Sequence, residues 1–303
     1  MAALNTAPAC YTPPMASAAK RLKSNAPGAF YVDATCIDCA TCRWVAPASF
    51  DAKGEASRVY RQPETPAEAQ RAEMAILACP VAAIGSLDKR DFAAARAAFP
   101  DPIEYPVHHC GYHSEDSFGA ASYLILRAEG NVLVDSPRFA KPLVERLEAL
   151  GGLRYMVLTH MDDVADHAKF RDHFGCERVL HAADVRPGTR DVEIGIEGDD
   201  AVGLAPGLTL IPTPGHTRGS MCLLFDEHFL FTGDHIAWSP ALGQIYAFRG
   251  VCWYDWGELV RSVERLAAYR FEWILPGHGF RCRFDAEAMP GELARCLAWM
   301  TAA

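Results

Sequence analysis

The stretch that decides how this chain is interpreted reads Tyr155-Met-Val-Leu-Thr-His-Met-Asp-Asp-Val-Ala-Asp-His167. Its first four residues are mostly apolar and predict a short buried strand of the kind found in parallel sheets. Directly after them come two histidines and three aspartates: His160, Asp162, Asp163, Asp166 and His167. Imidazole and carboxylate groups at the carboxyl end of a strand are what a metal site requires. A solvated charged loop is the alternative for this stretch taken alone.

Length and composition restrict the classes of protein to consider. A chain of 303 residues, half of them hydrophobic, is long enough for two globular domains. Its net charge of −9 argues against nucleic acid as the main partner, because phosphate binding needs basic patches. No apolar run reaches the roughly 18 residues of a membrane helix, so we expect no membrane partner and a cytoplasmic location. Eleven cysteines without a secretory segment point to metal rather than to disulfides.

The beginning of the chain has a composition of its own. Its first 27 residues contain no Asp or Glu, are rich in Ala and Pro, and include Lys20, Arg21 and Lys23. A transit peptide has such a composition, and so has a disordered segment. We expect a disordered extension over residues 1–20.

A cysteine motif follows this extension. Cys36, Cys39 and Cys42 are each separated by two residues, and the remote Cys79 is followed by Pro80. Three cysteines at this spacing, completed by a remote Cys-Pro, hold one 4Fe–4S cluster. A zinc site is the alternative, but zinc modules usually pair two Cys-x-x-Cys units. The pattern therefore predicts one iron–sulfur cluster.

This part of the chain resembles the single-cluster 4Fe–4S ferredoxins. Two stretches are typical of these ferredoxins: Ala-Pro-Ala-Ser-Phe-Asp, which follows Cys42, and Ala-Ile-Leu-Ala-Cys-Pro-Val-Ala-Ala-Ile, which surrounds Cys79. The resemblance implies that Cys36, Cys39, Cys42 and Cys79 are the cluster ligands. We expect a small α+β ferredoxin-like domain over residues 21–88 and a connector over residues 89–102.

Three further polar residues follow apolar runs later in the chain. His216 comes after Ile-Pro-Thr-Pro-Gly, Asp234 after Phe-Thr-Gly, and His278 after Ile-Leu-Pro-Gly. A glycine at each site lets the backbone turn sharply and direct the side chain to a common centre. Strands and helices alternate over this region, which predicts a layered α/β sandwich.

Four motifs of this chain, in this order, resemble those of the metallo-β-lactamase fold superfamily. They are the His160 stretch, Pro-Gly-His216-Thr-x-Gly-Ser, Gly-Asp234 and Pro-Gly-His278-Gly. The resemblance implies an α/β protein with an αβ/βα sandwich over residues 103–303 and a two-metal site at one edge of its sheets. By position, it implies that the first metal is held by His160, His216 and Asp234. The second metal would be held by Asp166, His167 and His278, with Asp234 bridging the two.

The first motif departs from the pattern of this superfamily, which is His-x-His-x-Asp-His. Asp162 stands where the second histidine belongs, and two extra residues precede Asp166 and His167. Either Asp162 or Asp163 fills the vacancy, or the first site is short of a ligand. Carboxylate-rich sets suit iron or manganese better than zinc. Flavodiiron proteins, relatives in the same superfamily, also place a carboxylate here, and an attached electron carrier feeds their redox-active site.

Two interpretations of function follow, and iron is the metal we favour. In the first, the cluster passes electrons to a non-haem di-iron site that acts on O₂ or a small molecule. No dinucleotide motif is present, so a separate electron donor or reductase would supply the electrons. In the second, a metal-bound hydroxide hydrolyses an ester, thioester or amide, Asp162 or Asp163 orients the water, and the cluster is structural or sensing. His235 would face the substrate or support the site in either case. A binding module with a degenerate site is a third, weaker interpretation.

Overall fold

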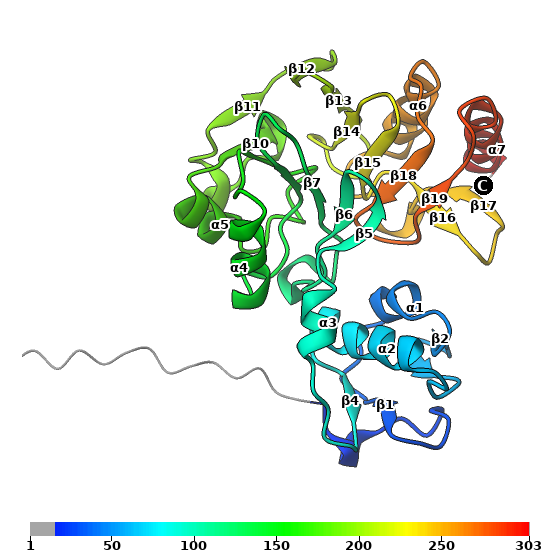
Figure 1. The fold of residues 1–303 in the computed structure, drawn as a ribbon. Coiled ribbons are helices and arrows are strands. Elements are labelled where there is room, and N and C mark those ends of the chain that lie inside the picture. The colour runs from blue at the N-terminus through cyan, green and yellow to red at the C-terminus, as the bar shows by residue number, and fades with distance from the viewer. Residues whose placement is uncertain (1–15, 303) are drawn as a thin grey trace, which may run out of the picture.

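The fold consists of a small N-terminal unit beneath a two-sheet sandwich (Figure 1). We describe it from a computed structural model, in which residues 16–302 are described. Of the extension expected over residues 1–20, residues 1–15 lie outside the described range. The remainder contacts the first strand, since the Tyr31 hydroxyl donates to the carbonyl of Ala16 at 2.9 Å and Ala18–Lys20 forms a 3₁₀ turn.

The N-terminal unit has four short strands and three helices. Its elements are β1 (Phe30–Val32), α1 (Thr41–Val45), β2 (Phe50–Ala52), β3 (Ser57–Val59), α2 (Pro66–Ala78), β4 (Ile84–Ser86) and α3 (Ala93–Ala97). β1 pairs antiparallel with β4, and β2 pairs antiparallel with β3. Helix α2 begins with a capping box, in which the Thr65 hydroxyl accepts from the Glu68 amide and the Glu68 carboxylate accepts from the Thr65 amide. This helix carries the chain back, so that Cys79 faces the other three cysteines.

The first sheet of the sandwich has seven strands in the order β11-β10-β9-β8-β7-β6-β5. They are β5 (Asp101–Glu104), β6 (Val107–His109), β7 (Tyr123–Ile125), β8 (Val132–Val134), β9 (Tyr155–Val157), β10 (Glu177–His181) and β11 (Ile194–Ile196). Strands β8 to β11 run parallel, as the apolar run before His160 predicts. Strand β5 begins inside the stretch that we expected to be a connector.

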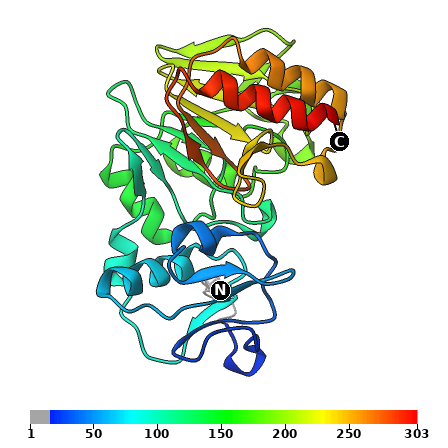
Figure 2. The same ribbon diagram turned by 90° about the vertical axis from the view of Figure 1, so that its right-hand side faces the viewer.

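The second sheet has six strands in the order β12-β13-β14-β15-β18-β19. They are β12 (Val202–Ala205), β13 (Leu208–Pro212), β14 (Met221–Phe225), β15 (Phe229–Gly233), β18 (Trp273–Pro276) and β19 (Cys282–Arg283). A separate hairpin, β16 (Ala237–Ser239) and β17 (Gln244–Tyr246), extends beside this sheet (Figure 2).

Helices cover both outer faces of the two sheets. Helices α4 (Lys141–Ala149) and α5 (His167–Phe174) pack on the first sheet, and α6 (Trp256–Leu266) and α7 (Met289–Ala302) pack on the second. A third apolar core lies between the sheets. The αβ/βα sandwich is therefore confirmed. The core under α4 and α5 continues into the N-terminal unit, so the two units share packed apolar contacts. Across residues 16–302, no helix is both long enough and apolar enough to span a membrane.

Candidate metal centre

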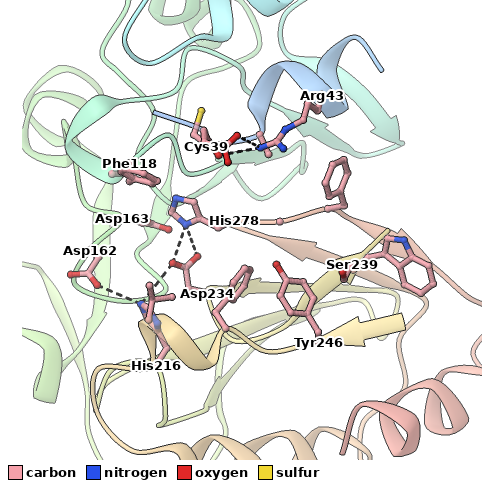
Figure 3. A pocket seen from close by; sticks show the side chains of 18 of the residues that line it. Cys39, Arg43, Phe118, Asp162, Asp163, His216, Asp234, Ser239, Tyr246 and His278 are labelled. Atoms are coloured by element: carbon pink, nitrogen blue, oxygen red, sulfur yellow. Dashed lines mark hydrogen bonds and ion pairs between the residues drawn. The ribbon is translucent and has the colours of Figure 1, made fainter. Parts of the chain in front are cut away.

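Four loops at one end of the two sheets bring a group of histidines and aspartates together. These loops follow β9, β13, β15 and β18 and carry His160, His216, Asp234 and His278. The Asp234 carboxylate lies in the middle, 3.8 Å from His160 Nε2, 3.7 Å from His216 Nε2 and 2.8 Å from His278 Nδ1. Figure 3 shows Asp234 and His278 directed toward one another. The sequence prediction that these residues share one centre agrees with this geometry.

Both members of the aspartate pair also reach this group. Asp162 Oδ2 lies 3.4 Å from His216 Nε2 and 4.0 Å from His160 Nε2. Asp163 Oδ2 lies 4.0 Å from His160 Nε2. The Asp162 side chain is 44% exposed at the pocket mouth, whereas that of Asp163 is 1% exposed. Both aspartates of the alternative that the sequence left open, Asp162 or Asp163, therefore lie within reach of the histidines.

Asp163 has room in the centre because the neighbouring residue 277 is a glycine. A Cβ atom on Gly277 would lie only 2.6 Å from Asp163 Oδ2 and 3.0 Å from Asp234 Oδ1. Burial, together with the nearby Asp234, holds the pKa of Asp163 well above its usual range. Two buried carboxylates this close are stable as anions only if a cation lies between them.

Several atoms in this group are buried and have no hydrogen-bond partner. They are His160 Nε2, both carboxylate oxygens of Asp163, both ring nitrogens of His216, and His278 Nε2. A buried polar atom without a partner costs about 1–3 kcal/mol, so six at one point require an explanation. Carboxylate oxygens and neutral imidazole nitrogens are the donors that bind metal ions. The donor set therefore fits the metal pair that the sequence predicted.

Asp166 and His167 do not join this group, and the prediction for them is corrected. The Asp166 carboxylate accepts from the Phe139 amide at 2.7 Å and from Lys169 Nζ at 2.6 Å. His167 is the first residue of α5, and its Nδ1 accepts from Arg178 Nη1 at 3.1 Å. The two extra residues place this pair at the start of the helix, and Asp163 lies in the centre instead.

His235 stands apart from the pocket as well. Its side chain is buried, and neither of its ring nitrogens has a hydrogen-bond partner. Burial lowers its pKa to about 3, so the ring is neutral. It is absent from the residues that line the pocket beside the metal group. A substrate-facing role for His235 has no support in this geometry.

Two buried aspartates hold the ligand loops in place. Asp135 accepts from the Thr159 amide at 2.7 Å and from the Thr159 hydroxyl at 3.0 Å, and that hydroxyl lies 3.0 Å from His160 Nδ1. Because the hydroxyl proton goes to Asp135, the oxygen accepts from His160 Nδ1, which leaves the Nε2 lone pair free for a metal.

Asp184 links two of the ligand loops to each other. Its Oδ2 accepts from the Met161 amide at 3.0 Å and from the Thr217 hydroxyl at 2.5 Å, and its Oδ1 accepts from the Gly219 amide at 2.7 Å. The side chain is fully buried. One carboxylate thus joins the loop of His160 to the loop of His216. Sequence reasoning missed this residue, because an Ala-Ala-Asp turn carries no motif.

The four cysteines of the N-terminal unit surround one small apolar cavity. Cys36, Cys39, Cys42 and Cys79 line it together with Val32, Ile37, Val81 and Ile84. Burial raises the pKa of the Cys79 thiol to about 12 and raises that of Cys42 further. Thiols this deeply buried become thiolates only when they bind metal, so the donor set fits the expected cluster.

One of these cysteines also lies at the pocket beside the metal group, with its sulfur directed away from that group (Figure 3). Cys39 lines the large pocket into which Asp234 and His278 open (Figure 3). The segment between them is tightly packed, since a Cβ atom on Gly119 would lie 2.8 Å from Cys39 Cβ. The ring of the adjacent Phe118 lies 6.2 Å from that of His278. Nothing in the sequence indicated this contact between the two units.

Comparison with protein families agrees with both parts of the chain. Residues 32–86 match the family model described as the 4Fe-4S single cluster domain of ferredoxin I. Residues 107–297 match the model of the metallo-beta-lactamase superfamily.

Two curated relatives match the second part. A hydroxyacylglutathione hydrolase of Rhodospirillum rubrum is 34% identical over 167 residues, which cover 52% of this chain and 61% of that protein. A probable metallo-hydrolase of Methanocaldococcus jannaschii is 26% identical over 193 residues, which cover 54% of this chain and 88% of that protein.

Solved structures agree on the fold. The metallo-beta-lactamase FIM-1 from Pseudomonas aeruginosa, solved in a mono-zinc form, aligns with a TM-score of 0.51 and 19% identity. This alignment covers 67% of the present chain and 95% of that one. At this level of identity the likeness concerns the architecture of the sandwich alone.

Proposed function

This chain belongs to the metallo-beta-lactamase superfamily, and we propose that its ferredoxin unit supplies electrons to the metal centre of its sandwich. The protein would be a non-haem di-iron oxidoreductase that acts on O₂ or a small molecule. A separate electron donor or reductase would reduce the cluster, because the chain has no dinucleotide-binding motif.

One observation carries this proposal: Cys39, a cluster ligand by sequence, lines the same pocket as Asp234 and His278. Gly119 packs against Cys39, and the ring of the adjacent Phe118 lies 6.2 Å from that of His278. Electron tunnelling becomes steeply slower with distance, so a carrier that serves a metal site has to lie near it. A purely structural cluster has no need for this position.

The residues divide into two sets. His160, Asp162 and His216 would hold one metal ion. Asp163 and Asp234 would hold the other, together with His160 or with His278, whose Nδ1 lies 2.8 Å from the Asp234 carboxylate. One set has two imidazoles and a carboxylate, and the other has two carboxylates and one imidazole. Such carboxylate-rich sets favour iron or manganese over zinc. When bound, such a pair supplies one-electron redox and Lewis-acid chemistry.

The protein groups around the centre control protons. Tyr246 directs its hydroxyl into the pocket beside Asp234 (Figure 3). Burial and the Asp234 carboxylate raise the pKa of Tyr246 to about 12, so it remains protonated near neutral pH and can donate a hydrogen bond to a bound oxygen atom. Phe118 and Trp253 line the same pocket and are largely exposed.

Hydrolysis is the second candidate, and the relationship to the Rhodospirillum rubrum hydrolase favours it. In that case Asp162, which is half-exposed beside His216, would orient the attacking water. The cluster would then serve structure or sensing.

One experiment separates the two functions. Wild type, Asp162→His and the matched surface control Asp172→His are expressed with iron and zinc both supplied. We then measure metal content, reductant-driven O₂ uptake, and hydrolysis of S-lactoylglutathione and of a generic ester. We expect iron and O₂ uptake in the wild type and in Asp172→His. Asp162→His restores the more usual imidazole, so it should shift loading toward zinc and lose O₂ uptake, since zinc has no redox chemistry. Zinc in the wild type, with hydrolysis and no O₂ uptake, contradicts the proposal.

A further inference from the structure

The pocket beside the metal centre is built by both units of the chain. It has a volume of about 1490 Å³. Seven of its described lining residues are aromatic. Trp238, Tyr246 and Phe248 come from around the β16–β17 hairpin, and Phe50, which is 2% exposed, comes from the ferredoxin unit. Aromatic side chains present flat apolar faces, which favour flat apolar ligands by stacking and by exclusion of water.

The charges around this pocket point to an uncharged ligand. Arg43 is the only lysine or arginine among the described lining residues, and its Nη2 already binds Asp38 Oδ1 at 2.8 Å and the Asp38 carbonyl at 3.1 Å. Outside the metal group, the other charged lining residues are Asp38, Asp51 and Asp116, of which Asp51 accepts from Arg58 Nε at 2.8 Å. Away from the metal centre, an anionic group on a ligand would therefore find no lysine or arginine in the described lining that is not already paired, and burying an unpaired charge is unfavourable.

We propose that this pocket binds an uncharged aromatic molecule, with one polar end at the metal centre and its apolar body between Phe50 and the β16–β17 hairpin. This inference rests on the proposed function, because it takes the pocket as the substrate site. It also distinguishes the chain from its hydrolase relative in substrate class. A glutathione thioester carries two carboxylates, for which the described lining away from the metal centre offers no unpaired lysine or arginine.

A pair of matched probes tests this selectivity. N-phenyl-1-naphthylamine and 8-anilino-1-naphthalenesulfonate share one ring system and differ by a single sulfonate. Equilibrium dialysis of the oxidised holoprotein against each probe avoids interference from the absorbance of the cluster. We expect the neutral probe to bind one molecule per chain and at least about tenfold more tightly than the sulfonate.

Variants locate the binding. Trp238→Ala and Phe248→Ala should each weaken binding of the neutral probe by about fivefold or more. Tyr105→Ala is the matched control, because this aromatic side chain is 81% exposed and lies outside the pocket lining. It should bind both probes as the wild type does.

A further variant tests the role of charge. Asp38→Asn releases the guanidinium of Arg43, and asparagine tolerates the backbone φ of 59° at this position. Binding of the sulfonate should become at least about threefold tighter, while binding of the neutral probe should not change. The visible spectrum of the cluster verifies that the loop of Cys39 is intact.

Equal affinity for the two probes, or unchanged binding of the neutral probe in both pocket variants, overturns this inference. The measurement uses neither reductant nor turnover. Selective binding together with absent O₂ uptake would contradict only the proposed redox function, and unselective binding with intact O₂ uptake would contradict only the inference about the substrate.

Discussion

Replacing Asp184 by asparagine should weaken metal binding, although this residue binds no metal itself. Its carboxylate accepts three hydrogen bonds from the loops that carry His160 and His216. An amide retains the shape of the side chain but turns one acceptor oxygen into a donor. If the NH₂ group takes the place of Oδ1, it meets the Gly219 N–H, and if it takes the place of Oδ2, it meets the Met161 N–H. In either orientation one backbone donor loses its acceptor.

The magnitude follows from this count. Hydrogen bonds to a charged acceptor contribute about 1.5–3 kcal/mol each, and the repulsion between two donors adds to the loss. We therefore expect Asp184→Asn to lose roughly 2–4 kcal/mol of folding stability. Residues that orient metal ligands typically change metal affinity by about 10–100-fold, and we expect a loss in this range.

The assay is metal retention against a series of chelator concentrations, measured by elemental analysis, with thermal unfolding in parallel. Asp199→Asn makes the same chemical change at an exposed position and should behave as the wild type. Thr217→Val removes one of the three bonds and should show an intermediate loss. If Asp184→Asn retains metal as tightly as Asp199→Asn does, the inference that Asp184 positions the ligand loops is refuted.

Two further predictions concern the cluster and the buried Arg178. The Thr41 hydroxyl lies 3.3 Å from Cys39 Sγ and 3.4 Å from the Gly119 carbonyl, which also accepts from His113 Nδ1 at 2.7 Å, so the hydroxyl is within reach of the sulfur as a donor. Thr41→Val should therefore lower the reduction potential of the cluster by roughly 30–60 mV in an EPR-monitored titration, whereas Thr41→Ser should leave it unchanged. A higher potential in Thr41→Val would contradict the hydrogen bond from Thr41 to the Cys39 sulfur. Burial raises the pKa of Glu193, but hydrogen bonds from Arg178 outweigh it and hold that pKa at about 2, below its ordinary value of 4.5. This depressed pKa stabilises the fold above pH 4.5, and the contribution is lost as the pH falls toward 2. Glu193→Gln should lower the free energy of unfolding by about 1–2 kcal/mol at neutral pH, after allowance for solvent screening. The difference in unfolding free energy between variant and wild type should become smaller below pH 4.5. A difference that stays constant there would contradict this reasoning.

Part of the metal centre was predictable because each ligand follows a recognisable strand. His216, Asp234 and His278 each come after an apolar run and a glycine, and strands of one sheet end at a common edge. Their convergence follows from this topology. The assignment of Asp166 and His167 failed for the opposite reason. It relied on a spacing that this chain does not keep, and the conformation of a loop with two extra residues is set by its neighbours.

Those neighbours lie far away in the sequence. Asp163 enters the centre because Gly277 leaves room for it, more than a hundred residues later. Phe118 and Gly119 adopt left-handed backbone conformations, with φ of 47° and 83°, and carry the chain between Cys39 and His278. No periodicity or motif indicates that the ferredoxin unit packs against this edge of the sandwich. The shared pocket is thus a product of tertiary packing.

The central claim is that the metal centre takes up electrons through the cluster. The most direct measurement is an anaerobic reductive titration, with the number of electrons taken up per chain as the readout. A 4Fe–4S cluster accepts about one electron, and a coupled iron pair would accept up to about two more. We predict more than one electron per chain in the wild type, and about one in Asp234→Ala, which lacks the carboxylate between the two metal sets. An uptake of one electron in both proteins would contradict the claim.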